Sequence, residues 1–77
     1  MILDKLLKQT FSLPEEITID DDIGPGDLKG WDSLGHVNLV NAIEKTYSIS
    51  LDLDEMISIE TVADIRELLI DKGISEF

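Results

Sequence analysis

Asp32, Ser33 and Leu34 are the residues whose types and order first suggest chemistry, because they stand where an amphipathic helix is predicted to begin. A serine hydroxyl becomes a nucleophile when a nearby base takes its proton, and His36 follows three residues later on the same predicted helix. The rest of a catalytic triad and an oxyanion site are not recognisable in the sequence. We therefore expect no catalytic residue here and no enzyme activity.

Two other roles remain open for Ser33. Either Asp32 or Ser33 could cap the helix, since a side-chain oxygen at this position accepts hydrogen bonds from free backbone N–H groups. A hydroxyl at a helix N-terminus is also a good place to carry a phosphate, because the helix dipole and the first-turn N–H groups favour an anion. Leu34 points toward solvent on the helical wheel. Beside a modifiable serine, it indicates a contact that partners use.

Several other kinds of site are excluded by what the sequence lacks. The segment GPG at residues 24–26 has neither a preceding strand nor a following GK[ST], so it is not a phosphate-binding loop. The acids at residues 20–22 lack the ligand spacing of a calcium loop. With no cysteine and one histidine, the chain offers no disulfide, no cysteine–zinc site and no histidine-rich metal site. We expect no bound metal.

The charge of the chain limits its partners. Seventeen acids against six bases give a net charge of −11 over 77 residues, a length that predicts a single domain over residues 1–77. Such a charge repels nucleic acid and anionic membranes, and it attracts basic protein surfaces. No apolar run approaches the roughly 18 residues of a membrane span, and the N-terminal residues lack a signal-peptide core. We expect a cytoplasmic monomer that binds neither nucleic acid nor membranes.

Three segments carry apolar residues at helical spacing, and they must position the serine. They are residues 2–11, residues 33–47, and the segment TVADIRELLIDKG at residues 61–73. Pro14 stops the first helix, while the last begins with a capping-box pattern and ends with Lys-Gly. The apolar arc of the second helix consists of Val37, Leu39, Val40, Ile43 and Tyr47. Such helices pack naturally as an up-and-down bundle.

The first connection, residues 12–32, is predicted to be a loop of about twenty residues. Loops of this length are uncommon in compact domains unless they are functional and pinned to the core. Trp31 is the expected anchor of this loop against the bundle. The other expected pinning residues are Ile17, Ile19, Ile23 and Leu28.

The second connection, residues 48–60, has two interpretations. The segment SISLDL alternates apolar and polar residues like a strand, although no partner strand is evident. Alternatively, Asp52 or Asp54 caps a short helix that runs through Met56 and Ile57, with both apolar side chains in the core.

The sequence resembles the acyl carrier proteins and the related peptidyl carriers. The attachment motif of that family is Asp-Ser-Leu at the start of the second helix, which here is Asp32-Ser33-Leu34. The segment GWDSLGHVNLVNAIEKTYSISL is similar to the second helix of the family, and ETVADIRELL is similar to its last helix. The long first loop is also a family feature. The resemblance covers essentially the whole chain and implies an all-α, acyl-carrier-like four-helix bundle with a short third helix.

The resemblance implies a carrier of acyl intermediates in fatty-acid, lipid or polyketide-type biosynthesis. Ser33 would be esterified with 4′-phosphopantetheine by a phosphopantetheinyl transferase that uses coenzyme A. The thiol of this arm would hold the acyl group as a thioester, and the protein would present it to several enzymes in turn. The expected partners are this transferase and acyl-loading, condensing or transfer enzymes with basic docking surfaces.

Recognition of these enzymes is expected along the second helix. The expected contact residues are Asp32, Leu34, Val37 and Glu44, with Val37 the least exposed of them. In the family, the exposed side of this helix usually carries several acids, whereas here those positions read Asn38, Asn41 and Lys45. This difference indicates a specialised carrier that serves its own enzymes.

Two alternatives to an acyl carrier remain open. One is a peptidyl carrier loaded with an amino acid, and the other is an unmodified acidic adaptor in which Ser33 is only a helix cap. In the adaptor, Ser33→Ala would cost about 0.5–2 kcal/mol of stability. His36 also has two possible roles, a satisfied and partly buried histidine or a residue bordering a cavity for the acyl chain. For Met56 and Ile57, the resemblance adds the lining of a cavity as a second interpretation beside a place in the core.

Overall fold

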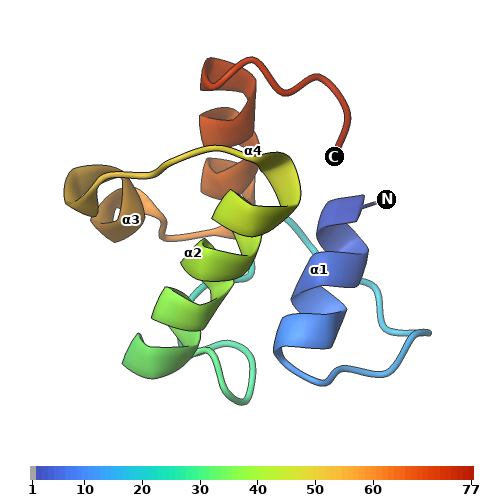
Figure 1. Cartoon of the computed structure of the whole chain (residues 1–77). Helices are drawn as coiled ribbons and strands as arrows, with labels where there is room; N and C mark the ends of the chain where they lie inside the picture. The colour runs from blue at the N-terminus through green and yellow to red at the C-terminus, as the bar shows by residue number, and fades with distance from the viewer. Residues whose placement is uncertain (1) are drawn as a thin grey trace.

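The computed structural model describes residues 2–77, which contain four α-helices and no strand. The helices are α1 (Ile2–Thr10), α2 (Ser33–Tyr47), α3 (Leu53–Ser58) and α4 (Val62–Asp71). The long helix α2 passes through the middle of the bundle, with α1 on one side and the short α3 on the other (Figure 1). The predicted all-α bundle with a short third helix is confirmed, and the SISLDL segment is not a strand.

The core is built from apolar side chains of α1, α2 and α4, together with a few residues from the connecting segments. Burial of each such side chain stabilises the fold by about 1.5–3 kcal/mol, which is the main favourable term in a domain of this size. The buried residues are Leu3, Leu6, Leu7, Phe11, Ile19, Trp31, Leu39, Val40, Ile43, Ile59, Val62, Ile65 and Leu69. Ile2, which the wheel places on the apolar face of α1, is instead 51% exposed because it lies at the open edge of the α1–α2 contact.

The long loop between α1 and α2 is a structural part of the bundle. The carbonyl oxygens of Asp21 and Ile23 accept hydrogen bonds from the backbone N–H groups of Ala63 and Val62, at 3.0 and 2.8 Å. These donors belong to the first turn of α4 and have no partner within their own helix. The loop thus caps α4, and Arg66 of α4 donates from Nε to Oδ1 of Asp21 at 2.8 Å. The prediction of a pinned loop is confirmed.

The pinning residues differ in part from the predicted set. Trp31 is only 1% exposed, and its ring stacks on Phe11 with the centroids 5.3 Å apart. Ile19 is buried as predicted, and Ile23 and Leu28 pack against the core while staying partly exposed. Ile17 is exposed, so its predicted role is wrong.

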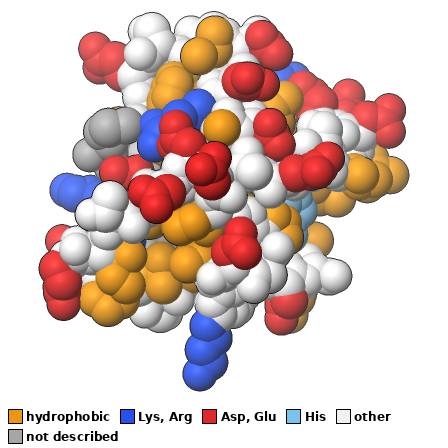
Figure 2. All heavy atoms as spheres, turned by 180° about the vertical axis from the view of Figure 1, so that it is seen from behind, with side chains coloured by type: hydrophobic (Ala, Val, Ile, Leu, Met, Phe, Trp, Pro, Cys, Tyr) orange, Lys and Arg blue, Asp and Glu red, His pale blue; other side chains and the backbone are white. Residues whose placement is uncertain are grey.

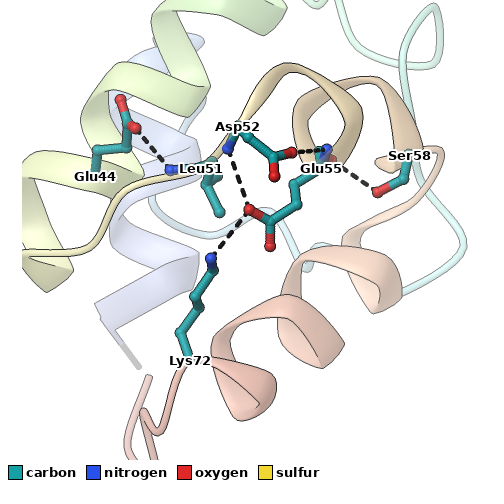
Figure 3. Close-up of polar contacts among 6 residues, drawn as sticks. All are labelled: Glu44, Leu51, Asp52, Glu55, Ser58 and Lys72. Carbon is teal, nitrogen blue, oxygen red and sulfur yellow. Dashed lines mark hydrogen bonds and ion pairs between the residues drawn. The ribbon is translucent and has the colours of Figure 1, made fainter.

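Helix α3 is fixed mainly by polar contacts (Figure 3). Asp52 and Glu55 form a reciprocal capping box, with the Glu55 N–H donating to Asp52 at 2.7 Å and the Asp52 N–H donating to Glu55 at 3.1 Å. Lys72, directly after α4, donates to Glu55 at 3.0 Å. The backbone hydrogen bond from Asp52, followed by the bond from Lys72, lowers the pKa of Glu55. All six residues of α3 are described, and none is buried.

The prediction that Ile57 is a core residue is wrong, since its side chain is 65% exposed. Only Met56 of the two predicted apolar residues packs partly against the core. The reason is that a helix of six residues, tied at its N-terminus and to Lys72, turns one of its sides to the bundle and leaves Ile57 on another. In the described part of the chain, no helix is long and apolar enough to cross a bilayer.

Candidate functional site

Ser33 is the first residue of α2 and is exposed. The helix cap is Asp32, whose Oδ1 accepts a hydrogen bond from the Gly35 N–H at 2.8 Å. The acceptor for this N–H is thus the Asp32 carboxylate and not the Ser33 hydroxyl. The two candidate caps are thereby separated: Asp32 closes the helix, and the hydroxyl of Ser33 stays available at its positive end.

Glycines bring the loop close to the first turn of α2. A Cβ at Gly35 would lie 1.8 Å from the carbonyl oxygen of Gly30, a distance no real side chain tolerates. Gly30 itself has a φ of +93°, in the region that favours glycine. The segment GWDSLG can therefore turn sharply from the loop into the helix and leave Ser33 at the corner.

An open and mostly apolar groove of about 690 Å³ begins beside Ser33. Its walls come from three places in the chain: the loop, the first two turns of α2, and α3. The main lining residues are Pro25, Trp31, Ser33, Val37, Met56 and Ile57. A chain attached at Ser33 can lie along this groove or extend away from the protein.

His36 joins the walls of the groove. The Trp31 Nε1–H donates to Nδ1 of His36 at 2.9 Å, and Nε2 lies 2.9 Å from the carbonyl oxygen of Met56. Because Nδ1 accepts, a neutral ring carries its proton on Nε2 and donates it to Met56. Both ring nitrogens are thus engaged, and the prediction of a satisfied, partly buried histidine is confirmed. His36 also lines the groove, and its predicted role beside the acyl chain stays a prediction.

The predicted recognition residues differ in their exposure. Leu34 is 71% exposed, which confirms that it faces solvent, and Val37 one turn later is 41% exposed despite its place on the predicted apolar arc. Asp32 is exposed while one of its oxygens caps the helix. Glu44 is partly buried, and its carboxylate accepts the Leu51 N–H at 2.8 Å. The expectation that Val37 is the least exposed of the four is therefore wrong, because the segment after α2 folds back onto Glu44.

One exposed apolar residue of α3, Leu53, was missed by the sequence reasoning, whereas Ile57 lines the groove, as its second interpretation predicted. Leu53 is 64% exposed and Ile57 is 65% exposed, one helical turn apart on α3. Their spacing in a short helix next to several acids is the signal that could have revealed an outward apolar face.

The comparisons with known proteins agree with this geometry. A family model described as a phosphopantetheine attachment site matches residues 3–69, so the chain belongs to the acyl carrier protein family of phosphopantetheine carriers. A "Probable acyl carrier protein" of Caulobacter vibrioides (strain NA1000 / CB15N) is 40% identical over 40 residues, which cover 52% of this chain and 46% of that protein. The chain thus matches about half the length of this relative. No solved structure matches the chain.

The group that this family carries is covalently attached 4′-phosphopantetheine. The residues around Ser33 fit such a group in two ways. An exposed hydroxyl at the first position of a fifteen-residue helix places an attached phosphate near the positive end of the helix dipole. The groove beside it has mostly apolar walls, which suit the uncharged remainder of the arm.

Proposed function

We propose that Ser33 carries the 4′-phosphopantetheine and that residues 1–77 act as one carrier domain for acyl intermediates in fatty-acid, lipid or polyketide-type biosynthesis. The observation that carries this proposal is the exposed hydroxyl of Ser33 at the first position of α2, inside the matched region. The printed name of the Caulobacter relative supports an acyl rather than an aminoacyl cargo.

The residues of this chain hold and present the arm, while the chemistry belongs to the arm and to the enzymes that use it. Asp32 caps the N-terminus of α2, so that the hydroxyl of Ser33 stays in a fixed position. Free N–H groups of the first turn and the helix dipole stabilise the phosphate charge. When bound, the arm supplies a thiol that holds the acyl group as a thioester.

Partner enzymes dock around this corner. Leu34 and Val37 offer apolar contacts on the first two turns of α2, and Asp32 contributes negative charge. Glu44 contributes less, because its carboxylate already accepts a backbone hydrogen bond. The net charge of −11 steers enzymes with basic docking surfaces toward the carrier, including a phosphopantetheinyl transferase.

The decisive test is the intact mass of the protein after incubation with coenzyme A and a broad-specificity phosphopantetheinyl transferase. We expect the wild type to gain one phosphopantetheine and the Ser33→Ala variant to gain none. Both proteins should have the same helical circular dichroism spectrum. A folded wild type that gains no mass would contradict the proposal and favour the unmodified acidic adaptor.

The kind of cargo is tested with loading enzymes offered to the modified protein. An acyl carrier should accept acyl groups from acyl-loading enzymes and remain unloaded by amino-acid-activating enzymes. Loading only by the latter would identify a peptidyl carrier instead. The neutral and basic residues Asn38, Asn41 and Lys45 on α2 lead us to expect that only a few loading enzymes are efficient.

A further inference from the structure

The few basic side chains of this acidic chain are not evenly spread over its surface. Figure 2 shows acidic side chains over much of the back of the molecule, with few basic ones among them. The hollow between α3 and α4 is typical of this surface, since Asp64, Glu67 and Asp71 line it. Between α1 and α2 the pattern is reversed, because the described residues that line the surface there include two lysines and no acid.

The first part of this surface is a hollow of about 250 Å³ where α1 lies against α2 (Figure 1). Ile2, Lys5 and Gln9 of α1 line it, together with Ala42 and Thr46 of α2. Ile2 is 51% exposed although it is apolar, and Lys5 in the same hollow is exposed as well. The hollow thus offers an apolar contact next to a positive charge.

The second part is a hollow of about 530 Å³ that adjoins the first at Thr10, which lines both. Its walls include Lys29 of the loop, and Gly35 and Asn38 of α2. Lys29 and Asn38 are exposed, and both hollows present more apolar than polar surface. We call the two hollows together the α1–α2 groove.

The α1–α2 groove lies on the opposite side of α2 from the groove beside Ser33. Gly35 and Asn38 line the α1–α2 groove, whereas His36 and Val37 line the groove beside Ser33. At about 100° per residue, the midpoints of these two pairs are roughly 180° apart around the helix. A partner seated in the α1–α2 groove therefore leaves the hydroxyl of Ser33 accessible.

The lysines of this surface are available to a partner. Among residues 2–77, the ion pairs are formed by Arg66 and Lys72, and neither Lys5 nor Lys29 takes part in one. Lys45 is also exposed and lies at helical spacing from the α2 residues of the groove. Ammonium groups beside apolar walls complement carboxylates beside apolar side chains, which is the pattern of an acidic amphipathic helix.

Charge disfavours the other occupants of the α1–α2 groove. A second copy of this chain would bring its own net charge of −11, and nucleic acid or an anionic membrane would bring a larger one. A single helix is small enough to meet the lysines at short range. There the local charges outweigh distant ones, because exposed charges more than about 10 Å apart are largely screened at 0.1 M salt.

We propose that the α1–α2 groove is a docking surface for an acidic amphipathic helix of a partner protein, which stays bound while the hydroxyl of Ser33 remains accessible. The apolar side of this helix lies against Ile2 and the apolar walls of the groove. Its carboxylates face Lys5, Lys29 and Lys45. The proposal goes beyond the carrier function and does not depend on modification of Ser33.

The probe is a synthetic helical peptide with Leu along one side and Glu on the others, titrated at low salt into the isotope-labelled protein and followed by NMR. We expect the backbone amide shifts to gather around Lys5, Lys29 and Asn38. The double variant Lys5→Gln/Lys29→Gln should bind the peptide about five- to tenfold more weakly, because two exposed ion pairs are lost. The control Ser50→Glu/Ser75→Glu changes the net charge equally at exposed positions outside the groove, and its affinity should stay close to that of the wild type.

Three outcomes would overturn this proposal. The first is a titration with no shifts, or with shifts that gather away from the α1–α2 groove. The second is an equal affinity of the wild type and the lysine variant, with both folded by circular dichroism, as expected because glutamine and lysine have similar helix propensities. The third is sedimentation showing that the protein alone dimerises through these lysines, which would make a second copy the occupant. A wild type that coenzyme A and the transferase leave unmodified would contradict only the proposed function.

Discussion

At the scale of single residues, the site depends on the different roles of Asp32 and Ser33. Asp32 accepts the Gly35 N–H and closes the helix, while Ser33 makes no such contact with residues 2–77 and keeps its hydroxyl exposed. A serine that served as cap would have its oxygen directed at the backbone. Modification of Ser33 therefore does not require the helix to lose its cap.

These different roles predict different losses of stability for two alanine variants. Asp32→Ala should lower the free energy of unfolding by about 0.5–2 kcal/mol, the usual cost of losing an N-cap. Ser33→Ala should change it by less than about 0.5 kcal/mol, as at other exposed positions. Urea unfolding followed by circular dichroism measures both. A larger loss for Ser33→Ala than for Asp32→Ala would show that Ser33 is the cap after all.

Gly35 gives a second prediction at this scale. A methyl group there would meet the Gly30 carbonyl oxygen, which is a backbone atom and cannot rotate away as a side-chain end could. Gly35→Ala should therefore cost more than about 2 kcal/mol, although alanine favours helices, because the loop and the first turn must move apart. Thermal unfolding measures this cost. Asn41→Ala, on the exposed side of α2, is the control, and a Gly35→Ala variant as stable as that control would contradict the geometry.

At the scale of elements, the sequence predicted the bounds of the helices better than it predicted the capping residue of α2 or the burial of side chains on α3. The bounds of α2 at residues 33 and 47 agree with its periodicity, and the capping box at Thr61 and Asp64 is present. Periodicity alone did not decide between Asp32 and Ser33 as the cap, because both residue types cap well and they are adjacent. The capping pattern of the third helix also left Ile57 misplaced in the core, because a cap shows where a helix begins but not which of its sides another element covers.

Helix α3 provides a prediction on pH. The pKa of Glu55 is lowered in the folded protein, so its contacts stabilise the fold above the ordinary value of 4.5 and lose this effect as pH falls through the lower folded value. Wild-type stability should therefore fall on acidification below pH 4.5 more steeply than that of Glu55→Gln. Urea unfolding at several pH values measures the two slopes.

Glu76→Gln is the control for this experiment, because it removes one exposed acid from the C-terminal segment rather than from α3. Its slope should stay close to that of the wild type. Identical slopes for the wild type and Glu55→Gln would show that the capping box and the Lys72 contact do not contribute to the pH dependence.

At the scale of the whole molecule, the large negative charge lowers the stability of the fold. Seventeen acids and six bases share a small surface, and like charges at close range oppose the compact state. Only a few of the acids among the described residues are paired with Arg66 or Lys72. The negative charge that is proposed to attract basic enzymes thus also reduces the stability of the carrier.

We therefore expect added sodium chloride to raise the melting temperature, because salt screens the repulsion between exposed charges. The Debye length is about 10 Å at 0.1 M and becomes shorter as the salt concentration rises. The double variant Asp20→Asn/Asp22→Asn should melt higher than the wild type at low salt and respond less to salt. It leaves Asp21 and its contact with Arg66 in place. A melting temperature that falls with salt would mean that attractive ion pairs dominate instead.

Trp31 is the only tryptophan of the chain and sits between Phe11 and His36, at the wall of the groove that begins beside Ser33. Its intrinsic fluorescence therefore comes from one place in the molecule, next to Ser33, the proposed attachment point of the arm. We therefore expect the emission of an unlabelled carrier to change continuously when cargo enters the groove and when an enzyme withdraws it.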